Sequence, residues 1–415
     1  MHFRQIYFFI IITGLFITGC QKLTTDPGDN DTDIQADNGL NYWGGSYDDF
    51  GHVVVQTADG GYAVVGSQYS SDTQNDLVLV KFSSSLVFES DTSFGGLNST
   101  YNNVANDLQQ TLDGGYILAG RTFNGTDDDV WVVKYTPQLS LAWQDTIKGS
   151  SHDVGNSVQE TEDGSFVVCG TSYDGNDYDI MLWKIASDGS SHEILYSETT
   201  DNNTNDFGNY AQELERSGGY IITGSSFSTT NSNDIRLIKL NSVGGTISVG
   251  FDSTYNITDG FFGDDGIFVQ PIDVEQGFVV VGNYWASGYG QNNVFILKTD
   301  INGADLNTSI ATFGGGFDDF GNCVMQTSDK GFIITGSKLS QSTSNKDVWV
   351  LKVTHDLSSE WEYKYGGDAD DEGKSVKQTT DGGYIITGNT YSYGNQSEII
   401  LLKIDREGKI QDFSE

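Results

Sequence analysis

The chain has 415 residues and a formal net charge of −37, with 51 glycines, 3 prolines, 21 tyrosines and 23 phenylalanines. Nucleic acid is bound by clustered Lys and Arg, so a surface this acidic argues against a nucleic-acid partner. The three cysteines, Cys20, Cys169 and Cys323, form no CxxC pair, which argues against a disulfide framework and a cysteine metal cluster. Many glycines and aromatic residues with few prolines favour short strands joined by tight turns.

The amino terminus has the pattern of a secretion signal. Residues 1–19 begin with the cationic Arg4 and continue into an apolar run over 6–19. That run is shorter than the roughly 20 residues that a membrane-spanning helix needs, although such a helix is the alternative interpretation. The run ends at ITGC over 17–20, which resembles the lipobox of bacterial lipoproteins. The resemblance implies a signal peptide over 1–19 and a lipidated Cys20 that anchors the protein to the outer membrane, with surface exposure left open.

The segment after the cysteine differs in composition from the rest of the chain. Residues 20–40 are polar and acidic and lack apolar periodicity, which predicts a flexible tether. Residues 41–415 form the remaining unit, and we expect this unit to be one domain.

One unit recurs seven times along residues 41–415. The string TADGGYAVVG, which ends at Gly66, returns in similar form at intervals of 50 to 58 residues. The copies end at Gly66, Gly120, Gly170, Gly224, Gly282, Gly336 and Gly388. A second string such as DLVLVK follows each copy and ends at Lys81, Lys134, Lys184, Lys239, Lys298, Lys352 or Lys403. Fixed spacing across seven copies indicates a repeat architecture.

Each unit has the pattern of a four-stranded antiparallel sheet. In the first copy the strands are predicted at 52–57, 62–68, 76–82 and around 86–94, with a DGG hairpin between the first two. The second and third strands are apolar on both faces, so each sheet needs a neighbour on either side. Seven such sheets arranged around an axis give an all-β fold, a seven-bladed β-propeller. The segments at 41–45 and 408–415 both resemble parts of a fourth strand, so either end could complete the last sheet.

The repeat is similar to the propeller repeats of envelope and secreted proteins of diderm bacteria, many of them without an assigned function. The stretch DVWVVK over 129–134, followed by LAW over 141–143, also resembles blades of quinoprotein-like propellers. These resemblances imply the fold and leave the activity open. The adjacent cysteines of quinoprotein dehydrogenases are absent from the sequence.

Two repeated positions have structural interpretations. The strand-ending lysine is expected to bond the turn carbonyls or the Asp of the DGG hairpin, since a catalytic lysine is not needed seven times. A second position, about 13 residues before each turn aromatic, holds an acid or Asn: Asp49, Asn103, Asp153, Asp206, Asp265, Asp319 and Asp371. These side chains either cap loop amides or form an acidic rim that binds Ca²⁺.

No cofactor is expected, and the alternative is Ca²⁺ or another cation bound at the acidic positions. The nearest match to a calcium loop is DADDEG over 368–373, where Asp368, Asp370 and Glu372 alternate. Thr379 stands at the twelfth position, where such a loop carries an acid, so the match is incomplete.

A ligand site is predicted where the loops between second and third strands carry an aromatic residue, as Tyr69 does in the first copy. The least regular loop is NYWASGYGQNN over 283–293, and its candidate ligand-binding residues are Tyr284, Trp285, Tyr289, Asn292 and Asn293. Exposed rings beside Asn suit stacking against sugars, whereas regular spacing favours packing.

The sequence assigns no catalytic residue. It predicts a monomeric, non-catalytic binding or scaffold module of the cell envelope, with a glycan or an envelope protein as its ligand. The alternative is a glycoside hydrolase or lyase that uses rim carboxylates such as Asp264, Asp265, Asp318 and Asp319.

Overall fold

The computed structural model describes residues 40–411 except 45–46, 70–74, 95–102, 150, 199–203, 216–217, 228–232, 258–262, 273–275, 287–290, 340–343 and 394–395. The predicted signal peptide, Cys20 and all but the last residue of the tether lie outside this part of the chain. None of the described residues belongs to a helix long and apolar enough to cross a membrane.

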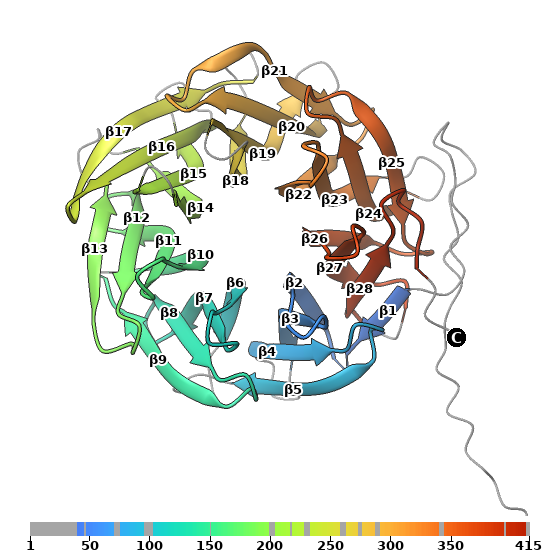
Figure 1. The fold of residues 1–415 in the computed structure, drawn as a ribbon, viewed down its shortest axis with the longest axis horizontal. Coiled ribbons are helices and arrows are strands. Elements are labelled where there is room, and N and C mark those ends of the chain that lie inside the picture. The colour runs from blue at the N-terminus through green and yellow to red at the C-terminus, as the bar shows by residue number, and fades with distance from the viewer. Residues whose placement is uncertain are drawn as a thin grey trace, which may run out of the picture.

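The described residues form seven four-stranded antiparallel sheets arranged around a central channel, as the repeats predict (Figure 1). In each blade the four strands, here A to D, run outward from the channel. The first four blades are β2–β5 (Asp49–Gln56, Tyr62–Tyr69, Asn75–Phe82, Phe88–Phe94), β6–β9 (Asn103–Gln110, Tyr116–Phe123, Asp128–Tyr135, Leu141–Ile147), β10–β13 (Asp153–Glu160, Phe166–Tyr173, Tyr178–Ile185, His192–Ser197) and β14–β17 (Asp206–Glu213, Tyr220–Phe227, Asn233–Val243, Thr246–Tyr255). The last three are β18–β21 (Asp264–Ile272, Gly277–Ala286, Gln291–Asp300, Asp305–Phe313), β22–β25 (Asp319–Gln326, Phe332–Leu339, Lys346–Val353, Ser359–Tyr365) and β26–β28 (Asp371–Gln378, Tyr384–Thr390, Glu398–Ile404) with β1 (Leu40–Trp43).

The amino-terminal strand closes the ring. β1 lies antiparallel to β28, with Tyr42 opposite Ile400, and supplies strand D of the seventh blade. In Figure 1 the blue β1 therefore lies beside the red β28. The carboxyl-terminal residues reach this sheet only through an isolated bridge between Ile404 and Ile410.

The apolar core is divided among the seven seams between blades. Each cluster of buried residues combines side chains of two neighbouring blades; Val64 and Val78 of the first blade, for example, pack with Ile399 and Leu401 of the seventh. Burying one such aliphatic side chain contributes roughly 1.5–3 kcal/mol. Because both faces of every sheet are used in this way, no blade could remain folded without its neighbours.

A β-bulge and a regular spacing of glycines shape the inner wall. In every blade the pairing of strands A and B shifts by one residue after the third residue of strand A, so the next residue is left unpaired. Glycines allow the close approach there: a Cβ on Gly66 would lie 2.1 Å from the carbonyl oxygen of Phe50, and one on Gly208 would lie 2.5 Å from that of Gly170 in the next blade.

Candidate functional site

The face of the disc that carries the D–A and B–C loops, here the loop face, is held together by buried carboxylates. In several blades the first residue of strand A accepts a backbone N–H from the loop before it, as Asp153 does from Gly149 at 2.7 Å and Asp371 from Gly367 at 2.8 Å. In the second blade Asn103 takes this place and accepts the hydroxyl of Thr122 at 2.6 Å. These contacts support the capping interpretation of the repeated acidic position.

In the fifth blade the predicted residue at this position is wrong by one. Asp264 pairs with strand B as the first residue of β18, is 0% exposed, and accepts the N–H of Ile257 at 2.7 Å. The predicted Asp265 instead accepts a hydrogen bond from the amide of Asn233 at 3.1 Å. Spacing counted from the turn aromatic failed here because the A–B hairpin has one more residue in this blade: Pro271 lies opposite Phe278, seven residues on, whereas Gln56 lies opposite Tyr62, six residues on.

In three blades an aspartate before the capping acid connects the blade to the preceding one. Asp318 accepts the backbone N–H of Asn292 at 2.8 Å, Asp370 that of Lys346 at 2.9 Å, and Asp48 that of Ser397 at 2.9 Å. The donors belong to strand C, or to the residue before it, in the neighbouring blade. Asp318 and Asp370 therefore hold neighbouring blades together by hydrogen bonds.

Two buried acids at these seams titrate far from their ordinary range. Burial, together with the negative charges of Asp49 and Asp48, raises the pKa of Glu398 to about 7. Burial also raises the pKa of Asp319 to about 6, although hydrogen bonds from Gly315 and Leu339 and the charge of Lys338 oppose the rise. Both side chains are almost fully buried, which keeps a large substrate away from them.

The structure brings together four of the five predicted ligand-binding residues. Tyr284 lies opposite Asn293, and Trp285 opposite Asn292, on the hairpin of β19 and β20, while Tyr289 lies outside the described residues. Tyr284 packs against the apolar cluster of the fourth and fifth blades, and Asn293 is buried. Asn292 is committed to Asp318. Trp285, half-buried, is the ring of this group best placed to contact a ligand.

The three residues of the predicted calcium loop have separate partners. Asp370 accepts the N–H of Lys346, Glu372 pairs with Lys374 at 2.7 Å, and the backbone carbonyl of Asp368 accepts the amide of Asn345. Within the described residues, these three acids do not bring their oxygens close enough together to share one metal ion. The prediction that they bind Ca²⁺ has no further support.

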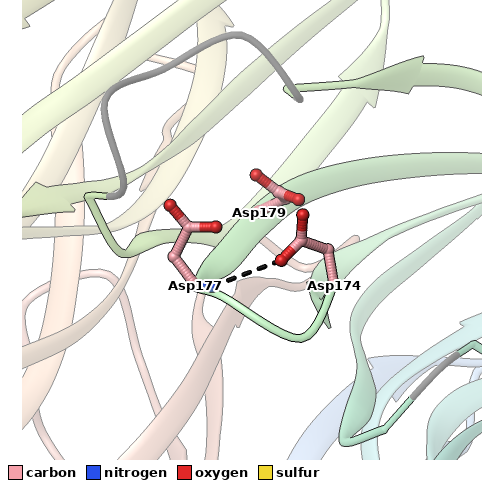
Figure 2. A group of neighbouring side chains, drawn as sticks. All are labelled: Asp174, Asp177 and Asp179. Carbon is pink, nitrogen blue, oxygen red and sulfur yellow. Dashed lines mark hydrogen bonds between the residues drawn. The ribbon is translucent and has the colours of Figure 1, made fainter.

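A different loop gathers three carboxylates. Oxygens of Asp174 and Asp177 in the B–C loop of the third blade, and of Asp179 at the start of β12, lie within 4.8 Å of one another (Figure 2). One oxygen of Asp174 already accepts the backbone N–H groups of Asn176 and Asp177, at 2.7 and 3.3 Å. This arrangement is typical of a turn closed by its own aspartate.

Aromatic side chains surround the loop face at the ends of the B strands, where the sequence places them. Tyr173 contacts Tyr178 with ring centroids 5.0 Å apart, and Tyr178 contacts Phe207 of the next blade at 5.4 Å. Phe227 and Tyr391 keep 38% and 49% of their surface exposed. The loop face thus offers rings to solvent, while the carboxylates that cap its loops are buried.

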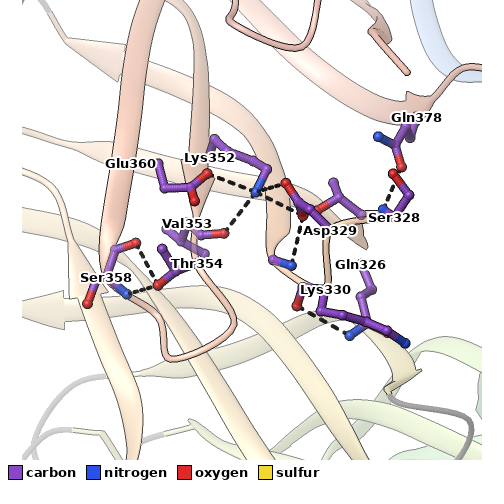
Figure 3. A network of polar contacts seen from close by, with 12 residues as sticks. Gln326, Ser328, Asp329, Lys330, Lys352, Val353, Thr354, Ser358, Glu360 and Gln378 are labelled. Carbon is purple, nitrogen blue, oxygen red and sulfur yellow. Dashed lines mark hydrogen bonds and ion pairs between the residues drawn. The ribbon is translucent and has the colours of Figure 1, made fainter. Parts of the chain in front are cut away.

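The opposite face, here the turn face, carries the A–B hairpins and the repeated lysines. Lys352 is 2% exposed and bonds Asp329 of the hairpin at 3.1 Å, Glu360 at 3.0 Å and the carbonyl of Val353 at 3.2 Å (Figure 3). Equivalent lysine–aspartate pairs join Lys81 to Asp59, Lys134 to Asp113, Lys184 to Asp163 and Lys403 to Asp381. The predicted structural role of the lysine is confirmed in these blades. In the fifth blade Lys298 instead bonds the carbonyl of His355 at 2.7 Å.

The channel contains functional candidates that sequence patterns did not indicate. The unpaired bulge residues, here the bulge ring, line its loop-face half: His52, Asn106, Asn156, Asn209, Ile267, Asn322 and Lys374. Asn156 and Asn209 donate to carbonyls of the next blade, Gly208 at 2.7 Å and Gly266 at 2.8 Å. Asparagine amides of the bulge ring therefore link neighbouring blades by hydrogen bonds.

Two cavities, of about 360 and 430 Å³, occupy the loop-face and turn-face halves of the channel. Only Asp107, Tyr210, Phe268 and Lys377 line both, so these four mark the place where the cavities meet. Burial raises the pKa of Asp107 to about 6, although hydrogen bonds from Val158 and Leu108 and the charge of Lys377 oppose the rise. A comparison of the repeats could have pointed to these four residues, because each differs from the residues at the same position in most other blades.

No family model matches the chain, and no curated protein matches it. Among solved structures, the chain is similar to the polysaccharide lyase Uly1, with a TM-score of 0.55 and 8% identity over 92% of this chain and 94% of that one. It is also similar to Sqt1 of Chaetomium thermophilum bound to the N-terminus of the ribosomal protein L10 (TM-score 0.49, 11% identity, 89% and 88% covered) and to a protein of unknown function from Dyadobacter fermentans DSM 18053 (0.49, 9%, 88% and 96%). At these identities the likeness concerns the fold. The protein is thus a seven-bladed β-propeller, a fold that suits a binding or scaffold module.

Proposed function

We propose that the protein is a non-catalytic binding module of the bacterial cell envelope, lipid-anchored to the outer membrane through Cys20, that takes a glycan at its loop face. One observation supports this proposal above others. Asp318, Asp319 and Asp371 of the loop face accept capping or seam hydrogen bonds, whereas the rings of Phe227 and Tyr391 stay accessible. An aromatic face can stack on the apolar face of a sugar without any acid–base chemistry.

The alternative is a glycoside hydrolase or lyase, and the similarity to the polysaccharide lyase Uly1 favours it. Catalysis would require rim carboxylates that can reach a substrate proton. Asp264 and Asp319 are fully buried, and Asp318 accepts two hydrogen bonds from Asn292. Asp265, half-buried, is bonded to Asn233. These commitments count against the enzymatic alternative.

Glycan-array binding by the purified protein tests the proposal. We expect a defined glycan to be retained, and Trp285→Ala and Tyr391→Ala each to weaken binding at least tenfold. Leu112→Ala is the matched control, because Leu112 is an apolar side chain 88% exposed on the turn face. Binding unchanged in both loop-face variants, or capture of an envelope protein with no retained glycan, would contradict the glycan proposal.

A further inference from the structure

A second ring of side chains joins the blades in the turn-face half of the channel. This glutamine ring consists of Val55, Gln109, Gln159, Gln212, Gln270, Met325 and Lys377, one from each strand A. Its glutamine carbonyls accept backbone N–H groups of the following blade: Gln109 from Glu160 at 2.5 Å, Gln159 from Glu213 at 2.7 Å and Gln270 from Gln326 at 2.8 Å.

These contacts show that each of these glutamines accepts a hydrogen bond through its side-chain oxygen. A backbone N–H can only donate, so the group it meets must be the amide oxygen, and the NH₂ group is left over. The ladder is interrupted at Gln212, because the next residue in the series is Pro271, which has no N–H. The glutamines of the ring therefore have side-chain NH₂ groups that can donate to a molecule in the cavity that they line.

Lys377 adds a positive charge to this ring. Its ammonium lies 5.7 Å from the centroid of the Phe268 ring, and no carboxylate of the described residues forms an ion pair with it. The other channel lysine, Lys374, is neutralised by Glu372 at 2.7 Å. Lys377 is thus the cation that a molecule in the turn-face cavity would meet.

The remaining wall is partly apolar and includes the carboxylate of Asp107, which has hydrogen-bond partners. Burial raises the pKa of Asp107 to about 6, so this group carries a negative charge at pH 7.5, which Lys377 partly offsets. Tyr210 and Phe268 pack with ring centroids 4.0 Å apart. Asp107 accepts the N–H groups of Leu108 and Val158, at 2.8 and 2.9 Å, one on each oxygen. His52 bonds Ser67 at 2.8 Å, and its burial together with the charge of Lys374 lowers its pKa to about 4, so it is neutral at physiological pH.

From this juxtaposition we propose that the turn-face half of the channel, a cavity of about 430 Å³, binds a small organic carboxylate. The carboxylate accepts hydrogen bonds from Lys377 and the glutamine amides, while its carbon body lies against Tyr210 and Phe268. Charge-assisted hydrogen bonds of this kind are the stronger ones in proteins. The acidic exterior repels anions, but at 0.15 M salt charges more than about 8 Å away are largely screened. This site is independent of the proposed glycan site on the loop face.

Titration calorimetry of the whole protein at pH 7.5 and 0.15 M salt tests the proposal with matched pairs: benzoate against benzamide, and glucuronate against glucose. We expect at least one carboxylate to bind, with its neutral counterpart at least tenfold weaker. Lys377→Gln should lower the affinity at least tenfold. That substitution gives the seventh blade the residue found in blades two to five, and an unchanged unfolding midpoint will show that the variant folds.

Two control variants test whether the effect is specific to this cavity. Lys374→Gln removes the same charge from the same blade but from a lysine paired with Glu372, and it should leave the affinity within about threefold. Trp285→Ala should not change carboxylate binding, whatever its effect on glycans. The proposal is overturned if neutral counterparts bind equally well, if Lys377→Gln binds as the natural protein does, or if neither carboxylate binds at about 10 mM.

Discussion

Charged residues on the two faces of this propeller make its stability depend on pH in opposite directions. On the turn face, buried lysines are paired with aspartates that accept several hydrogen bonds. Burial would raise the pKa of Asp113 and of Asp381, but hydrogen bonds from threonine, glycine and lysine lower both to about 2. Their contribution to stability is present above the ordinary pKa of 3.8 and is lost as the pH falls toward 2.

Removing one buried ammonium tests the turn-face pairs. Lys352→Met keeps the apolar stem but removes the ammonium that Asp329, Glu360 and the Val353 carbonyl accept from, while Asp329 keeps its bonds from Thr327 and Gly331. Both carboxylates are partly exposed, so we expect the free energy of unfolding in urea to fall by only about 1–2 kcal/mol. Lys148→Met, at an exposed lysine, should change it by less than about 0.5 kcal/mol. Equal losses of unfolding free energy in the two variants would mean that the buried lysine–carboxylate pairs do not stabilise the protein.

On the loop face the sign of the pH effect is reversed. The pKa of Glu398 rises from 4.5 to about 7, because burial and the charges of Asp49 and Asp48 disfavour its ionised form. Its contribution is fully present below pH 4.5 and is lost as the pH rises through about 7.

Glu398→Gln should therefore flatten the decline of the unfolding temperature between pH 5 and pH 8, and stabilise the protein at pH 8. The substitution is conservative, since Asn293 holds this place in the fifth blade. A thermal scan at each pH measures the effect. A variant that declines as steeply as the natural protein would show that Glu398 is not the titrating group.

Among the structural elements, β1 is the strand that makes the ring continuous. The other strands D follow their strand C along the chain, whereas β1 is separated from β28 by the whole propeller. Its Trp43 packs against the apolar cluster of the seventh and first blades. The seam should therefore open locally when this contact is lost.

Trp43→Ala tests the closing strand, with Trp143→Ala in β9 as the matched control, because Trp143 packs in the same partial way on the seam of the second and third blades. Each change should cost about 2 kcal/mol, since both side chains are only partly buried. Hydrogen exchange in β28 should accelerate only for Trp43→Ala. Equal exchange in both variants would contradict a closing role for β1.

Much of this arrangement could be predicted from the repeats. The predicted strands of the first unit at 62–68 and 76–82 are within a residue of β3 and β4, because apolar runs and the DGG turn mark them clearly. The closing terminus could not be predicted, because both ends of the chain resemble strand D. Asp265 was misplaced because spacing does not reveal an extra residue in the hairpin between strands A and B. Lys377 and Gln212 were missed because pairing across blades gives no local signal.

At the scale of the whole molecule, buried acids of the loop face hold loops and blade seams together, and several aromatic rings of that face stay exposed. The formal charge of −37 is thus compatible with a folded surface, since part of it is buried in seams and hairpins. The central claim is that the loop face binds a glycan and does not cleave it.

Mass spectrometry of an array-selected glycan, recovered after prolonged incubation with a stoichiometric amount of the purified protein, tests that claim most directly. The account predicts that the glycan is recovered intact and that Asp318→Asn changes nothing in its mass. Shortened or unsaturated products that disappear with Asp318→Asn would show that the rim carboxylates are catalytic.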